Sequence, residues 1–186
     1  MDQVTIAEYD PQWPILFEQE ARAIRQVLGE RLVGIEHFGS TSVPGLAAKP
    51  IIDIIIATRS KDDWPLIIEP LRTIGYACWM GNTDPTRMFF AKVTPPQSQH
   101  RTHHLIVAEF GGHHWERLTL LRDYFRAHLD EAFLYETYKR ELGVRFRESR
   151  GAYTKAKGPY LDRIEDRARE DRKWNSQSSA NSDSGK

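Results

Sequence analysis

The sequence has little cysteine, no net charge and no long apolar run, and each shortage excludes a class of protein. The single cysteine, Cys78, excludes an internal disulfide framework and is consistent with a reducing compartment. The 26 basic residues balance 26 acidic ones, so the chain has no overall field to attract nucleic acid or an anionic membrane. The longest apolar run, residues 51–57, is interrupted by Asp53 and is far too short to cross a membrane. Since the N-terminus also lacks the features of a signal peptide, we expect a cytoplasmic protein whose anion sites are local.

Periodic apolar residues are present, and they predict strands and helices in the first half of the chain and helices in the second. The expected helices of the first half cover residues 15–29 and 62–74, and the expected strands cover residues 32–38, 51–57, 76–80, 87–93 and 102–109. Three helical segments then begin near His113, Asp130 and Ser149, and the last is interrupted at Gly158-Pro159. This order predicts one α+β domain over residues 1–174 with a helical C-terminal half.

Two segments are expected to lie outside regular structure. The Pro95-Pro96 segment reads as an exposed loop. Residues 175–186 lack large apolar side chains, so they cannot bury enough surface to fold and are expected to be a disordered tail.

Asp53 is the anomaly of the sequence, because it lies inside a run of isoleucines. Strand alternation places it on one face with Ile51 and Ile55. A lone buried carboxylate costs several kcal/mol unless a cation or hydrogen bonds compensate it. Asp53 could hold Mg²⁺ between the protein and a bound phosphate, or it could pair with Lys49 or an arginine, and its position alone favours neither interpretation.

The turn Gly39-Ser40-Thr41-Ser42 precedes this strand and combines a glycine with three hydroxyl side chains. Backbone N–H groups and hydroxyls in such a turn suit phosphate oxygens, although the same residues are also common in ordinary turns.

Adjacent polar residues on the predicted strands must point to opposite faces. Only one of Glu36 and His37, and only one of His103 and His104, can therefore share a cavity with Asp53. The pair His113-His114 is more typical of a helix start, and neither histidine pair has the spacing of a zinc-binding helix. In the C-terminal half, Tyr153 and Lys157 lie four residues apart and share a helix face, where a base or sugar could stack while the lysine meets phosphate.

The segment EHFGSTSVPGLAAKPIIDI, residues 36–54, resembles the signature of the GrpB family, a branch of the nucleotidyltransferase-like superfamily that includes DNA polymerase β. Segments 9–14, 101–105, 122–128, 138–142 and 153–157 also resemble family segments in family order. The resemblance spans most of residues 9–164. It implies a mixed β-sheet flanked by helices.

The superfamily pattern is a Gly-Ser turn followed by a strand with two alternate carboxylates, which hold two Mg²⁺ ions for attack on a nucleotide α-phosphate. Gly39-Ser40 and Asp53 match this pattern, but Ile55 stands where the second carboxylate is expected. The resemblance therefore implies that Asp53 is a metal ligand and that Glu36 or His104 supplies the further ligand, so that Asp53, Glu36 and His104 form the catalytic site, with Asp53 and Glu36 as its expected metal ligands.

The resemblance implies a Mg²⁺-dependent nucleotidyltransferase that uses a nucleoside triphosphate or another phosphorylated small molecule and modifies a small-molecule or protein acceptor. The residues it suggests for phosphate or nucleotide binding are Gly39, Ser40, Thr41, Ser42, Lys49, Arg101, Lys139, Tyr153 and Lys157. The alternative is a non-catalytic nucleotide-binding or enzyme-accessory domain, like the segment appended to dephospho-CoA kinase in some bacteria, and Ile55 motivates it. A purely structural protein, with Asp53 satisfied internally, is the third interpretation.

Overall fold

The computed structural model describes residues 3–93 and 100–183, with side chains described as far as Ser176, so the Pro95-Pro96 loop lies outside the described residues. Five strands form one mixed sheet in the order β1-β2-β5-β4-β3. Strands β2 and β5 are parallel, and the other neighbours are antiparallel. The strands are β1 Gly34–Phe38, β2 Ile52–Thr58, β3 Tyr76–Cys78, β4 Met88–Val93 and β5 Arg101–Glu109.

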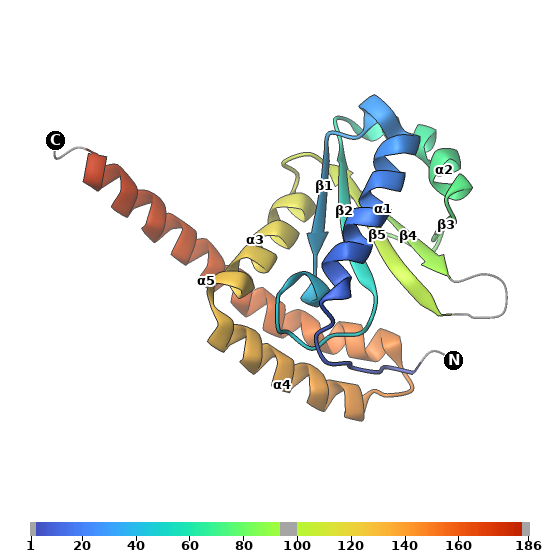
Figure 1. The fold of residues 1–186 in the computed structure, drawn as a ribbon. Coiled ribbons are helices and arrows are strands. Elements are labelled where there is room, and N and C mark those ends of the chain that lie inside the picture. Colours follow the sequence, from blue (N-terminus) through green and yellow to red (C-terminus); the bar gives the residue numbers. More distant parts are fainter. Residues whose placement is uncertain (1–2, 94–99, 184–186) are drawn as a thin grey trace.

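Helices cover both faces of this sheet, and the C-terminal half is helical (Figure 1). Helices α1 and α2 pack on one face, whereas α3 packs on the other and is followed by α4 and α5. The α-helices are α1 Gln12–Leu28, α2 Trp64–Thr73, α3 His113–Ala127, α4 Leu129–Arg145 and α5 Arg150–Asp183. Short 3₁₀ turns occupy Gly29–Arg31, Ser40–Ser42 and Lys61–Asp63. The predicted α+β class is confirmed, and none of the helices in the described ranges has the length and apolarity needed to cross a bilayer.

Strand β2 is the centre of the fold because its alternate side chains enter two separate cores. Ile52, Ile54 and Ile56 pack against α1 and α2. Ile55 and Ala57 pack on the opposite face, in the core that contains Trp115 of α3. Asp53 therefore lies on the α3 face, at the end of the strand where the sheet meets the helical half.

The segment between β1 and β2 joins the sheet to the C-terminal helices. Val43 and Leu46 are buried against Leu121 and Phe125 of α3 and Ile164 of α5. A fourth cluster joins the N-terminal segment to α4 and α5. This packing closes the helical half around the turn that precedes β2.

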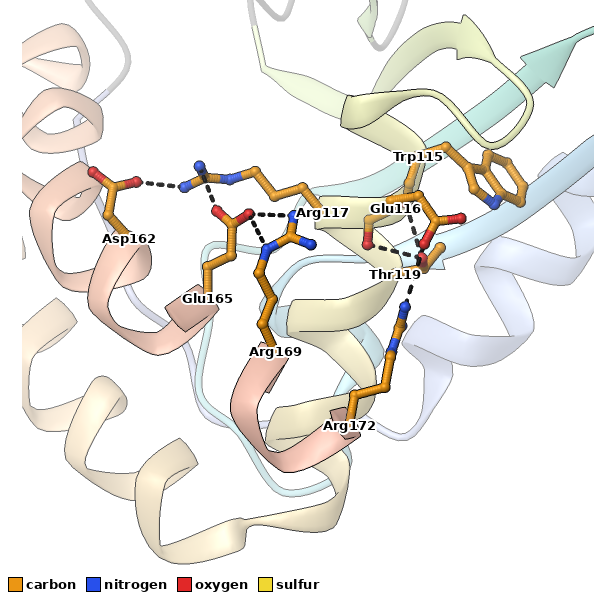
Figure 2. A network of polar contacts seen from close by, with 8 residues as sticks. All are labelled: Trp115, Glu116, Arg117, Thr119, Asp162, Glu165, Arg169 and Arg172. Carbon is orange, nitrogen blue, oxygen red and sulfur yellow. Dashed lines mark hydrogen bonds and ion pairs between the residues drawn. The ribbon is translucent and has the colours of Figure 1, made fainter. Parts of the chain in front are cut away.

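Ion pairs hold α5 against α3 (Figure 2). The Arg117 guanidinium of α3 lies 2.6 Å from Asp162 and 2.7 Å from Glu165 of α5. Within α5, Arg169 lies 2.7 Å from the same Glu165. Partly exposed pairs of this kind contribute little to stability, so we assign them the role of orienting α5. The orientation matters because α5 carries part of the site described below.

Two boundaries differ from those expected. Helix α1 begins at Gln12 rather than Ile15, because Asp10 Oδ1 accepts the Gln12 N–H at 2.8 Å and a proline is tolerated in the first turn. Helix α5 continues through Gly158-Pro159 and as far as Asp183, so residues 175–183 belong to it. The last part of this helix extends away from the body of the molecule, as Figure 1 shows, in agreement with its lack of apolar side chains.

Candidate functional site

A cavity of about 680 Å³ lies where the α3 face of the sheet meets the β1–β2 segment and the C-terminal helices. Strands β2 and β5 contribute Asp53 and His104 to its wall, and α4 and α5 contribute Lys139 and Lys157. Its volume is typical of a site for a small-molecule ligand.

Asp53 forms a hydrogen-bonded pair with His104, because these residues face each other in the parallel β2–β5 register. The distance between Asp53 Oδ1 and His104 Nδ1 is 2.9 Å. Burial alone raises the pKa of Asp53, but the hydrogen bond and charge of His104, followed by the charges of Lys49 and Lys157, hold this pKa below its ordinary value. Asp53 is therefore a carboxylate at neutral pH.

Gly39 allows this carboxylate to approach the turn. Gly39 has φ +71°, a conformation that favours glycine, and a Cβ atom built there would lie 2.7 Å from Asp53 Oδ2. The glycine of the predicted Gly-Ser turn thus has a second role, which is to leave room for the carboxylate.

Lys139 reaches the turn from α4 and is almost completely buried, with 2 % of its surface exposed. Its ammonium group donates hydrogen bonds to Ser40 Oγ at 2.9 Å and to the carbonyl of Ala47, and it lies 5.0 Å from the centre of the Tyr135 ring. Burial, with the charge of Lys157, lowers the pKa of Lys139 to about 7.

Lys49 and Lys157 flank the buried ring of Tyr153. Their ammonium groups lie 5.2 Å and 4.8 Å from the ring centre. Burial, followed by the charge of Lys157, lowers the pKa of Lys49 to about 8, and burial also lowers the pKa of Lys157. In the described chain, no carboxylate lies within ion-pair distance of Lys49, Lys139 or Lys157.

The charge of the cavity is strongly unbalanced. Among the described residues, eight basic side chains line it and Asp53 is the only acidic one. Two of the basic residues have carboxylate partners, since Arg87 pairs with Asp84 and Arg122 pairs with Glu36. The positive charge of Lys49, Lys139 and Lys157 suits a polyanionic ligand.

Most residues suggested for the site line this cavity, although they come from distant parts of the chain. Those that line it are Gly39, Ser40, Thr41, Lys49, Asp53, Arg101, His104, Lys139, Tyr153 and Lys157. Ser42 does not line it, because its hydroxyl donates to the Gly39 carbonyl at 2.6 Å. Glu36 lies on the predicted face, but its carboxylate binds Arg122 at 2.5 Å and does not line the cavity.

Further cavity residues were not among those suggested by the sequence. They are mainly basic or aromatic, and they include Trp79, Arg87, Phe89, Arg122, Arg150 and Lys155. No sequence motif identifies them as site residues. Basic residues on helices are usually solvated, and an aromatic residue at the end of a hairpin strand is usually interpreted as part of the core.

The donor set does not fit two metal ions. Ile55 is fully buried in an apolar cluster, and the Glu36 carboxylate is bound to Arg122. Within residues 3–93 and 100–183, no group of three or more His, Cys, Asp or Glu side chains is arranged to hold a metal. Asp53 is thus the carboxylate available for a cation, and the charges of Lys49 and Lys157, rather than a second acid, act on it.

Comparison with known proteins assigns the chain to a family. The model of the GrpB protein family matches residues 3–167. The chain belongs to the GrpB family. It is 42 % identical to UPF0157 protein PA4798 of Pseudomonas aeruginosa over 167 residues, which are 90 % of this chain and 68 % of the relative. The crystal structure of the conserved protein GrpB from Enterococcus faecalis matches with a TM-score of 0.79 and 33 % identity, covering 88 % of this chain and 96 % of that one.

A shorter similarity extends to an enzyme. Dephospho-CoA kinase of Mycolicibacterium paratuberculosis is 34 % identical over 76 residues, which are 39 % of this GrpB-family chain and 19 % of the kinase.

Proposed function

We propose that this GrpB-family protein binds a phosphorylated small molecule in the Asp53 cavity, with Lys49, Lys139 and Lys157 as its principal phosphate ligands. The observation that carries the proposal is the convergence of these three ammonium groups on one cavity, with no carboxylate partner in the described part of the chain. Burying unpaired cations is unfavourable, and a bound polyanion removes that cost.

The hydroxyl of Ser40 supports the same role. It accepts a hydrogen bond from Lys139 and lines the cavity, so the turn and the lysine form one polar surface. Because this contact joins β1–β2 to α4, the phosphate-binding groups are held in place before a ligand arrives, which reduces the entropy lost on binding.

Inorganic tripolyphosphate provides the test, because it presents phosphate oxygens and nothing else. At a concentration about 100 times its Kd, the ligand stabilises the fold by roughly 2.7 kcal/mol, which raises the melting temperature by several degrees. The double variant Lys49→Met/Lys157→Met is expected to lose this shift, whereas Lys173→Met, on the exposed part of α5, keeps it. No shift with the wild-type protein would contradict the proposal.

Nucleotidyl transfer is the second candidate function. Its specific support is the position of Asp53 beside the Gly39-Ser40 turn, which matches the nucleotidyltransferase-like pattern. In such a reaction an acceptor oxygen attacks the α-phosphorus, the bond from this phosphorus to the bridging oxygen breaks, and pyrophosphate leaves with its charge neutralised by the lysines. A Mg²⁺ ion, if the reaction uses one, would be held by Asp53.

The variant Asp53→Asn separates binding from transfer. If the cavity only binds phosphates, loss of this negative charge leaves tripolyphosphate affinity in EDTA unchanged or increases it. If Asp53 holds Mg²⁺, the variant loses any Mg²⁺-dependent increase in nucleotide affinity and any release of pyrophosphate. Titration calorimetry with and without Mg²⁺, combined with a pyrophosphate assay, distinguishes the two.

A further inference from the structure

Trp79 is an exposed aromatic side chain in the wall of the cationic cavity. It follows β3, and 58 % of its surface is exposed. Its ring packs edge-on to Phe89 of β4, with ring centres 5.9 Å apart, and both side chains line the cavity. Single exposed aromatic residues are common on proteins, so the exposure of Trp79 is not unusual in itself. Its position in the wall of a cationic cavity is the informative feature.

The Trp79 ring has a defined orientation. The backbone N–H of Trp79 donates to the Phe89 carbonyl at 2.8 Å, so the β3–β4 pairing continues to this residue. The ring lies against the backbone at Gly81, where a Cβ atom would be 3.0 Å from the indole Nε1. Glycine at position 81 therefore allows the indole to pack closely on its own turn.

The rest of the β3–β4 turn is also fixed by polar contacts. The Asn82 side-chain amide donates to the Arg87 carbonyl at 2.6 Å, and Asp84 lies 2.9 Å from His114 of α3. The exposure of Trp79 is thus not the result of a loose turn.

The cavity consequently has two kinds of wall. Lys49, Lys139 and Lys157 provide ammonium groups for phosphates, and Trp79 with Phe89 provides an aromatic surface. Every nucleobase has a π face that stacks on an aromatic side chain, and this interaction tolerates different bases. A nucleoside polyphosphate combines a polyanion with an aromatic base in one molecule, and the 680 Å³ of the cavity is within the range for such a ligand.

We propose that Trp79, supported by Phe89, is a stacking subsite for the base of a nucleoside polyphosphate whose phosphates lie among Lys49, Lys139 and Lys157. This assignment depends on the phosphate-binding function proposed above. The lysines alone indicate a phosphorylated ligand, whereas the stacking subsite specifies a nucleoside polyphosphate.

The test compares ATP with inorganic tripolyphosphate, since the two differ by the nucleoside. Binding is measured by titration calorimetry in EDTA, at one ionic strength, for the wild-type protein, Trp79→Ala, Trp79→Phe and Met80→Ala. Met80 is the matched control, because it is adjacent in the chain and 88 % exposed but does not line the cavity. Because the Trp79 side chain is largely exposed, its replacement is expected to leave the fold intact, which circular dichroism and the melting temperature check.

The wild-type protein is expected to bind ATP at least about tenfold more tightly than tripolyphosphate. Trp79→Ala abolishes this preference by weakening ATP alone, Trp79→Phe restores most of it, and Met80→Ala changes neither affinity. Equal affinity of the wild-type protein for both ligands, or a preference for ATP that survives in Trp79→Ala, would overturn the stacking subsite but leave phosphate binding standing. If neither ligand binds the wild-type protein, the phosphate-binding function fails and the subsite fails with it.

Discussion

The two faces of the sheet each bury a polar cluster, and the clusters differ in their balance of charge. On the α1 face, Lys92 Nζ lies 2.9 Å from both carboxylate oxygens of Glu20, and His103 lies 3.9 Å from the same carboxylate. On the α3 face, His104 pairs with Asp53, but the neighbouring lysines have no carboxylate partner among the residues that the structure describes. In the first cluster the lysine has a carboxylate partner, whereas the second cluster opens on a cavity and has an excess of positive charge.

The adjacent histidines of β5 explain why this difference is informative. His103 and His104 are adjacent residues of the same type, and they point to opposite faces of the sheet. Neither the residue type nor the position in the sequence therefore distinguishes the two clusters. The clusters differ in whether a carboxylate neutralises the charge of the lysine. The Lys92–Glu20 pair compensates its own charges, whereas the buried Lys139 and the half-buried Lys49 and Lys157 favour an anion from outside.

Loss of Lys92 is expected to have the largest effect, and it falls on stability. Lys92→Met leaves the carboxylate of Glu20, which is 8 % exposed, buried without its cation, so the free energy of unfolding decreases by about 3 kcal/mol. Tripolyphosphate affinity stays unchanged, because Lys92 is on the face opposite the cavity. Urea denaturation and calorimetry measure the two quantities. Lys61→Met, which removes an exposed ion pair with Glu109, is the control and changes stability by less than about 0.5 kcal/mol.

A stable Lys92→Met variant would mean that the α1-face cluster is not a self-contained pair. Loss of tripolyphosphate binding in a folded Lys92→Met variant would mean that the two clusters are coupled through the sheet.

The second largest effect is expected at Gly39, whose role is to admit Asp53. Gly39→Ala is expected to lower the free energy of unfolding by about 2 kcal/mol, because the new methyl group meets Asp53 Oδ2 and the backbone has positive φ. Gly45→Ala is the matched control, since Gly45 also has positive φ (+80°) but nothing lies within 4 Å of its added Cβ. Its cost is about 1 kcal/mol, from backbone strain alone. Equal losses in the two variants, measured by urea denaturation, would refute the contact with Asp53.

The sequence predicts the elements of this fold well, because local periodicity determines them. The isoleucine run of β2 and the place of Asp53 on the face of Ile55 follow from alternation. Alternation also implies that one of His103 and His104 shares this face, but the β2–β5 register decides that it is His104. The extent of α5 does not follow from the local sequence, because Gly158-Pro159 predicts an interruption of the helix. Tyr153 and Ile164, which are buried on either side of it, hold the helix through the proline.

The candidate site is less predictable, because its contacts link residues far apart in the chain. The resemblance to the GrpB signature indicated Asp53 and Lys139, which lie on β2 and α4. It could not show that Arg122 of α3 binds Glu36, since that contact depends on how α3 packs on the sheet. Trp79 was not recognised for a similar reason: its exposure at the cavity depends on the geometry of a turn that periodicity does not describe.

The third prediction is a smaller effect that falls on binding rather than stability. Lys157→Met weakens tripolyphosphate binding about tenfold, the size expected when one charge-assisted hydrogen bond of 1.4 kcal/mol is lost. The free energy of unfolding stays the same or increases, because the variant removes a desolvated cation that has no carboxylate partner. The exposed Lys173→Met changes neither property. If Lys157→Met destabilised the fold as strongly as Lys92→Met, the proposed difference between the two faces would not hold.

The smallest expected effect is the pH dependence of the cavity lysines, which acts in opposite directions on binding and on stability. The pKa values of Lys139 and Lys49 are lowered from 10.5 to about 7 and about 8, so both ammonium groups are charged below pH 7 and lose protons as the pH rises towards 9. Tripolyphosphate affinity should therefore fall severalfold over this interval. In the ligand-free protein, the unfolded chain binds more protons than the folded one from about pH 7 to pH 10.5, so the contribution of these lysines to stability rises with pH.

Proton uptake provides the direct measurement, because a bound polyanion raises the pKa values of the lysines again. Calorimetry at pH 8 in buffers of different ionisation enthalpy should detect uptake of protons when tripolyphosphate binds to the wild-type protein. Uptake should be smaller for Lys49→Met, and comparison of the two proteins removes the contribution of the ligand's own titration. Equal uptake by both proteins would show that Lys49 does not bind the phosphates, and the anion site would then have to be assigned to Lys139 and Lys157 alone.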